Sequence, residues 1–169
     1  GQILKAPMSG EYAGGKVRFN HLCAILELPI ISDGSLSSII FTTPQAAVCG
    51  EGVISAGSLV LNEGASKSVT LQMDGASKEQ DGNYHSYFLL PAQNYPGGFN
   101  LEVKMTTGES FLYERTKDLY LSPGCIGVEQ AIESSYFSGG FGTQEKPYRI
   151  ARPADLLQLR DLINSESYA

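Results

Sequence analysis

The stretch Leu22-Cys23-Ala24-Ile25-Leu26-Glu27-Leu28 decides the fold class of this chain. Its even-numbered positions are all apolar, whereas its odd-numbered positions include a cysteine and a glutamate. This alternation has the period of a β-strand, whose successive side chains point to opposite faces of a sheet. We therefore predict a strand over residues 17–31, and a strand this long and apolar is expected at the centre of a sheet.

The chain continues in the same way as far as residue 132. Clusters of Gly, Pro, Asn and Ser separate segments that alternate or are apolar throughout. Strands are predicted at residues 36–43, 53–61, 68–73, 84–91, 99–105, 110–121 and 125–132, with an exposed loop at 74–83. Because no helix lies between them, we predict a mainly β fold: an antiparallel Greek-key β-sandwich of about seven strands, with one short C-terminal α-helix.

Both ends of the chain differ from this central domain. Residues 1–16 form an N-terminal segment with an expected edge strand at 2–8, which Ser9-Gly10 and Gly14-Gly15 separate from the rest. Residues 134–169 contain a Gly/Ser linker, a short strand and an amphipathic helix. The sandwich is therefore assigned to residues 17–133.

The C-terminal helix is predicted from its first turn. Pro153 suits the first helical position, and Asp155 lies near the positive end of the helix dipole. Leu156, Leu159 and Ile163 then recur at helical spacing. Such a stripe must dock, either on the sandwich or in a larger module that begins here.

Composition and charge exclude several classes of partner. The chain has 169 residues, with 12 Lys and Arg against 18 Asp and Glu, and its net charge is −6. Nucleic-acid binding needs clustered cations, which this chain lacks, and an acidic surface disfavours anionic membranes. No run of about 18 apolar residues is present, so no transmembrane segment is expected. The chain also carries no signal sequence, so any export signal or lipid anchor is expected upstream.

The residues offer little material for catalysis. His21 and His85 both fall in predicted strands, and no metalloprotease, P-loop or nucleophile-elbow motif is present. We interpret both histidines as structural and predict no enzyme, no cofactor and no metal site, with a hydrolase using either histidine as a minor alternative. Cys23 is expected to be buried, and the wide spacing of the three cysteines indicates no disulfide framework.

Three other features have a functional and a structural reading. Asp74, Glu79 and Asp81 could bind calcium, although a solvated loop is the favoured interpretation. Residues 139–142 resemble a phosphate cradle but are better read as a turn. The third feature is a set of aromatic residues that could stack on sugar rings, although core packing is favoured for them; its predicted members are Tyr84, Tyr95 and Tyr136.

The segment Phe19-Asn20-His21-Leu22-Cys23-Ala24-Ile25-Leu26 resembles the first core strand of the fimbrillin family, which forms fimbriae on anaerobic Gram-negative bacteria. Later segments resemble other motifs of that family in the same order. These are Ile39–Thr42, Tyr87-Phe88-Leu89-Leu90-Pro91, Phe99-Asn100-Leu101-Glu102-Val103 and Leu121-Ser122-Pro123-Gly124. The resemblance covers about residues 17–132, and the order of the motifs carries it.

A second resemblance lies near the C-terminus. Gly140-Phe141-Gly142-Thr143, Pro147-Tyr148-Arg149-Ile150 and Asp155-Leu156 resemble the opening of GLUG-like or β-helix repeat modules in bacterial surface proteins. This resemblance implies that residues 134–169 include the start of a downstream module.

The fimbrillin resemblance implies a transthyretin-like Greek key, exported as a lipoprotein to the outer membrane or fimbrium. Assembly in the family proceeds by addition of a strand from one subunit to the next. This chain departs from polymerising subunits because it has one predicted sandwich and no lipid-attachment cysteine. It therefore resembles a non-enzymatic adhesion, accessory or tip protein, with other surface proteins, receptors or glycans as partners. The alternative is a carbohydrate-binding module of a secreted or surface protein.

Overall fold

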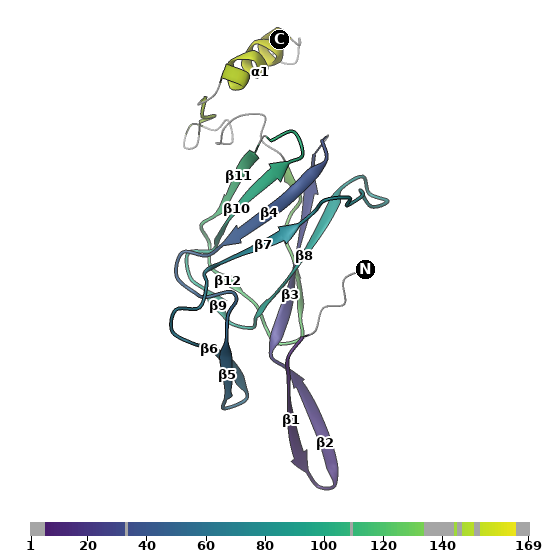
Figure 1. Ribbon diagram of the computed structural model, residues 1–169, viewed down its shortest axis with the longest axis vertical. Coiled ribbons are helices and arrows are strands. Elements are labelled where there is room, and N and C mark those ends of the chain that lie inside the picture. The colour runs from purple at the N-terminus through teal and green to yellow at the C-terminus, as the bar shows by residue number, and fades with distance from the viewer. Residues whose placement is uncertain are drawn as a thin grey trace.

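Two β-sheets stacked face to face form the body of the protein in the computed structural model (Figure 1). The structure describes residues 6–32, 34–108, 110–133, 144, 147–150 and 153–164. The first sheet has the order β11-β10-β4-β7, with strands Ser110–Arg115, Phe99–Met105, Leu36–Thr42 and Ser68–Gln72. In the second sheet β3 (Cys23–Ile31) is central, between β8 (Tyr84–Pro91) on one side and β13 (Ile126–Val128) with β14 (Ile132–Glu133) on the other.

The core lies between the two sheets and follows from the alternation in the sequence. Leu26 and Leu28 of β3 and Leu90 of β8 point inward from the second sheet and are fully buried. Phe41 of β4 bridges the layers, because its ring lies 5.4 Å from that of Phe88 in the second sheet and 4.9 Å from that of Phe99 in the first. The predicted mainly β, antiparallel sandwich is confirmed.

The strand order is not sequential. β10 returns beside β4, so it separates β4 from β11 in the first sheet, which is a connection of the Greek-key type. One part of the sandwich departs from the antiparallel prediction. The expected strand at 125–132 is divided into β13 and β14, and both pair parallel to β3. Parallel pairing is possible here because the chain crosses the sandwich before it returns beside β3.

The N-terminal region differs most from the prediction. Ser9-Gly10 does not break a strand, because both residues lie within β1 (Met8–Ala13). The expected strand at 17–31 is divided at Leu22 into β2 (Lys16–His21) and β3. β1 and β2 pair as a hairpin whose turn residues Gly14 and Gly15 have φ of 58° and 79°. Two successive positive φ angles suit the tight hairpin turn that glycine permits, so the glycines join two strands.

A second hairpin replaces the single strand expected at 53–61. It consists of β5 (Gly52–Ser55) and β6 (Ser58–Leu61). Its turn has positive φ at Ala56 (49°) and Gly57 (77°). Because alanine seldom adopts a positive φ, the sequence contained a weak turn signal at this point.

Three further elements, β9, β12 and α1, complete the described fold. The segment expected as one strand at 110–121 ends at Arg115 as β11, and Leu119–Tyr120 then forms β12, which pairs with β9 (Asn94–Tyr95). The predicted helix is α1 (Pro153–Asn164), with Asp155 in its first turn. Leu156 and Ile163 of its expected apolar stripe are exposed, so these two side chains are not docked. The predicted strand at 2–8 and the Gly/Ser linker lie largely outside the described residues.

Candidate functional site

The β1-β2 hairpin projects from one end of the sandwich (Figure 1). Residues directly opposite each other on paired strands share a face. One face, called here the hairpin apolar face, therefore carries Met8, Tyr12, Val17 and Phe19. All four side chains are exposed, with Tyr12 at 75% and Phe19 at 67%. The opposite face carries Ser9, Glu11, Lys16, Arg18 and Asn20, so the hairpin is amphipathic.

The exposure of the hairpin apolar face to solvent is unusual for an isolated two-stranded hairpin. A two-stranded hairpin alone is marginally stable in water, and its apolar face normally packs on other protein. A contiguous apolar patch on a protein surface usually marks an interaction site. The β5-β6 hairpin lies toward the same end of the molecule in Figure 1 and also exposes Val53, Ile54 and Val60. This end of the protein therefore presents apolar side chains on two hairpins.

The second sheet also has an unusual solvent-facing side. We define its apolar outer face by Ile25, Tyr87, Leu89, Ile126 and Val128, which the strand register places in two adjacent rows. Ile126 is 63% exposed and Val128 is 62% exposed. The outer face of an antiparallel sheet normally carries polar residues.

The first sheet follows that rule and provides an internal comparison. Its outward positions are mainly polar, including Thr70, Gln72, Asn100, Glu102 and Lys104. The contrast between the two sheets indicates that the apolar outer face of the second sheet is adapted to contact another apolar surface.

The edge strand β8 leaves part of its backbone unpaired. The bond from the Ala92 N–H to the Leu22 carbonyl, 3.2 Å long, shows that Cys23 and Pro91 form a non-hydrogen-bonded pair. By the same alternation, the N–H and C=O groups of His85, Tyr87 and Leu89 point away from β3. None of them has a backbone partner among the described residues. Such an edge can accept an added strand.

A histidine links this sheet to the neighbouring loop. The Nδ1 atom of His85 lies 2.6 Å from Glu27 Oε1 on β3, and its Nε2 atom lies 2.9 Å from Asp81 Oδ2 in the loop at 74–83. Asp81 also accepts the backbone N–H of Asn83 at 3.0 Å. The cluster therefore ties the loop to β3 and β8.

The electrostatics of this cluster favour a charged imidazole. The hydrogen bond to Asp81, followed by the one to Glu27, raises the pKa of His85 above its ordinary value. The Asn83 N–H, followed by His85, lowers the pKa of Asp81. Each imidazole nitrogen of His85 lies within hydrogen-bond distance of a carboxylate, and a protonated imidazole can donate to both of them. Each nitrogen is engaged by a carboxylate of the same chain, in keeping with the structural role predicted for His85.

Two of the three predicted sugar-stacking residues are in the core. Tyr84 is 6% exposed and Tyr95 is 0% exposed, and both belong to the hydrophobic core. The prediction of a stacking platform is therefore wrong for this pair, and Tyr136 lies outside the described residues. Lys78 Nζ lies 5.8 Å from the centre of the Tyr84 ring.

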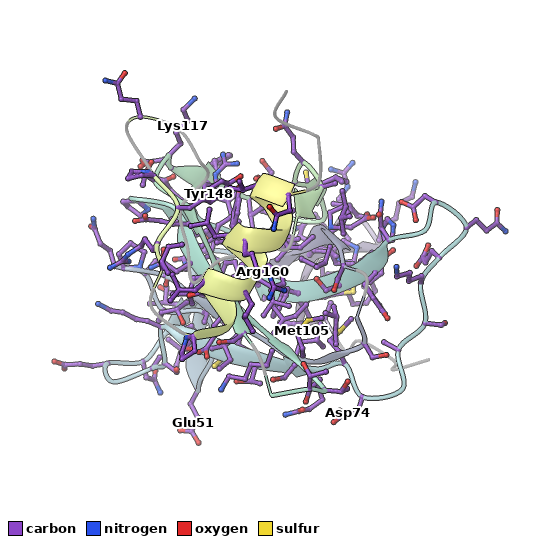
Figure 2. The ribbon with its side chains drawn as sticks, turned by 90° about the horizontal axis from the view of Figure 1, so that it is seen from above. Glu51, Asp74, Met105, Lys117, Tyr148 and Arg160 are labelled. Atoms are coloured by element: carbon purple, nitrogen blue, oxygen red, sulfur yellow. The ribbon has the colours of Figure 1, made fainter. Side chains whose placement is uncertain are left out.

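The remaining predicted features of the sequence have simpler outcomes. Asp74 and Glu79 are exposed, and Figure 2 shows Asp74 projecting outward at the margin of the molecule. Among the described residues no group of three metal-ligating side chains occurs. Cys23 is buried as expected, and burial raises the pKa of its thiol. All three cysteines are free, and residues 139–142 lie outside the described part of the chain.

A groove beside β11 and β13 is held by an arginine. Arg115 forms an ion pair with Glu129, and its side chain also donates to the Lys117 and Asp118 carbonyls. Lys117 projects outward at the rim in Figure 2. Because the Arg115 guanidinium is shared among three partners of its own chain, we interpret it as a structural link between the two sheets and the groove as a consequence of that link.

The two apolar surfaces were missed by sequence reasoning, although both left signals. Gly14-Gly15 lies between alternating apolar residues, which is a hairpin signature. On the outer face, odd-numbered residues such as Ile25 and Leu89 are as apolar as their inward neighbours.

No helix in the described ranges has the length and apolar character needed to cross a membrane. In comparisons with known proteins, no family model matches the chain and no curated protein is significantly similar to it.

Proposed function

We propose that this protein is a non-enzymatic adhesion domain of the cell surface, or an accessory or tip protein of a fimbrium, that acts by protein–protein contact. The observation that carries this proposal is the amphipathic β1-β2 hairpin, which holds Tyr12 and Phe19 in solvent away from the core. Aromatic residues of this kind are frequent anchors of protein interfaces.

The open edge of β8 supports a second mode of contact. Unpaired N–H and C=O groups at Tyr87 and Leu89 suit the addition of a strand from a partner. Both nitrogens of His85 are held by carboxylates of its own chain, which supports a structural role for this residue in a non-enzymatic protein. The resemblance to fimbrillins adds the expected location, at the outer membrane or on the fimbrium.

A carbohydrate-binding module is the second candidate. The predicted sugar-stacking residues Tyr84 and Tyr95 are buried and cannot reach a glycan, so this candidate depends on other aromatic residues. Tyr12 and Tyr120 are well exposed and could stack on sugar rings. Binding to a glycan array that depends on either ring would favour this function over protein–protein contact.

The proposal is tested with beads that carry the full chain. The beads are applied to cultured epithelial monolayers and to lawns of bacterial cells, and bound beads are counted. The double variant Tyr12→Ser with Phe19→Ser is expected to bind at least about tenfold more weakly. Truncating a buried aromatic side chain at an interface commonly costs more than about 1.4 kcal/mol of binding free energy, which corresponds to a tenfold loss of affinity. Leu112→Ser is the matched control, because it removes an exposed apolar side chain from the first sheet.

Two results would contradict the proposal. In one, wild-type beads bind to neither surface above the level of uncoated beads. In the other, the hairpin variant binds as well as wild type, which would show that the hairpin is not the contact.

A further inference from the structure

The two apolar surfaces of this chain cannot meet within one molecule. The β1-β2 hairpin points away from the sandwich, whereas the apolar outer face lies on the side of the sandwich body (Figure 1). We propose that the partner is a second copy of this chain, and that the hairpin apolar face of one copy packs on the apolar outer face of the next. This inference deepens the proposed function and rests on the hairpin being a binding element.

Both surfaces are faces of β-sheets, so they can pack on each other as layers. Each strand of the hairpin has six residues and so spans about 20 Å. The outer face presents the rows Ile126-Ile25-Leu89 and Val128-Glu27-Tyr87 across three neighbouring strands. Two flat sheet surfaces pack about 10 Å apart with their side chains between them. The docked hairpin would thus form a third layer on the sandwich.

The size of the contact fits a specific but weak association. Tyr12 and Phe19 are 75% and 67% exposed, so at about 200 Å² per aromatic side chain they offer about 300 Å². With Met8, Val17 and the matching area on the partner, the buried surface is on the order of 1,000 Å². That is the lower end of specific interfaces, so association is expected only at high protein concentration.

The charge distribution decides how the copies are oriented. The described N-terminal residues 6–21 contain Lys16 and Arg18 against Glu11, which is a net charge of +1. Since the whole chain has −6, the remaining residues carry −7. A contact between two hairpins, or between two sandwich bodies, would bring like charges together.

A hairpin on a sandwich body instead brings opposite net charges near each other, and because Lys16 and Arg18 lie on the hairpin face opposite to the contact, this attraction acts at long range. Glu27 lies within the apolar outer face, and Glu79 and Asp81 lie in the loop beside β8. His85 and Lys78 lie in the same region, so the acidic groups there are partly neutralised. The contact is therefore head to tail and leaves one free hairpin and one free face, so it can repeat into open chains.

Sedimentation of the full chain over a wide concentration range tests this inference. Wild type is expected to form a concentration-dependent series of oligomers that shrinks as salt is raised. Two variants should stay monomeric: Tyr12→Ser with Phe19→Ser, which lacks the hairpin contact, and Ile126→Ser with Val128→Ser, which lacks the face. An equal mixture of the two is expected to form a dimer and nothing larger.

The mixture is the decisive arm, because each variant retains the half that the other lacks. Leu112→Ser is the control and should associate like wild type. If the β13 substitutions unfold the protein in a thermal melt, Tyr87→Ser on β8 replaces them. A wild-type protein that stays monomeric up to about millimolar concentration would overturn the inference. So would wild-type association without a dimer in the mixture.

The failure of this inference is distinguishable from failure of the proposed function. If beads adhere through the hairpin while the protein stays monomeric in solution, the proposed function stands and the partner is another protein. If the protein associates as described while the beads bind to no cell, self-association stands and the adhesive role falls.

Discussion

Replacing Tyr95 by phenylalanine keeps the buried ring and removes the interactions of its hydroxyl, which are the bond to the Pro91 carbonyl and a contact with the Gln93 side chain. The Tyr95 hydroxyl donates to the Pro91 carbonyl at 2.7 Å, and its side chain is fully buried. That carbonyl points away from β3, because Pro91 belongs to a non-hydrogen-bonded pair. Tyr95→Phe therefore leaves a buried acceptor without this donor, and we expect the free energy of unfolding at pH 7 to fall by about 1–3 kcal/mol.

The same substitution has a distinct effect at alkaline pH. Burial raises the pKa of Tyr95 to about 12. In the unfolded chain the phenol ionises near its ordinary value of about 10, so the wild type loses stability as pH rises from 10 through 12. At pH 11 this loss is about 1.4 kcal/mol, and Tyr95→Phe does not suffer it. The difference in stability between the two proteins should therefore shrink between pH 9 and pH 11.

Urea unfolding followed by circular dichroism at pH 7, 9 and 11 measures both effects. Tyr120→Phe is the matched control, because Tyr120 is exposed and should change stability by less than about 0.5 kcal/mol. The reasoning would be refuted if Tyr95→Phe were as stable as Tyr120→Phe at pH 7, or if its deficit stayed constant up to pH 11.

Three further predictions concern other parts of the protein. The pKa of His85, measured by NMR, should lie above 6.5 and should fall in the Asp81→Asn variant. The stability that the protonated His85 contributes should be lost as pH rises through this raised pKa. An unchanged His85 pKa in the variant would contradict the assignment. Gly98→Ala should destabilise the fold by more than about 3 kcal/mol, because its Cβ would lie 2.0 Å from a backbone carbonyl oxygen. Gly64→Ala, which has a positive φ but open space, should cost about 1–2 kcal/mol, and equal losses on urea unfolding would show that the close approach is unimportant. A thiol reagent should modify Cys125 rapidly in the native protein and the other two cysteines slowly, as a peptide map would show, because Cys125 is the exposed thiol.

The outcome at the candidate sites shows which inferences a sequence supports. His85 was interpreted as structural because no catalytic motif accompanies it. Its partner Glu27 lies 58 residues earlier in the chain, so the clamp exists only because β3 and β8 pair in one register. The sequence offers Tyr84 and Tyr95 as members of an aromatic platform, and Tyr95 falls between the predicted strands at 84–91 and 99–105. Because β8 carries apolar residues on both faces, its alternation does not report which face packs on the opposing sheet.

The hairpins illustrate the same limit in another way. Gly14-Gly15 was read as a break, since glycine permits both a chain break and a tight turn. The choice between them depends on whether the flanking strands pair. The parallel pairing of β13 with β3 was equally hidden, because direction is set by the path of the chain around the sandwich.

Local patterns in the sequence are sufficient to predict a mainly β sandwich with a short C-terminal helix. Strand period, turn residues and helix capping are local properties that can be read within about ten residues. Three other properties follow from tertiary contacts: Phe19 is exposed on a projecting hairpin, the outer face of the second sheet is apolar, and both nitrogens of His85 lie beside carboxylates. These properties arise from contacts between distant segments, which depend on how strands pair and which faces the two sheets bury against each other.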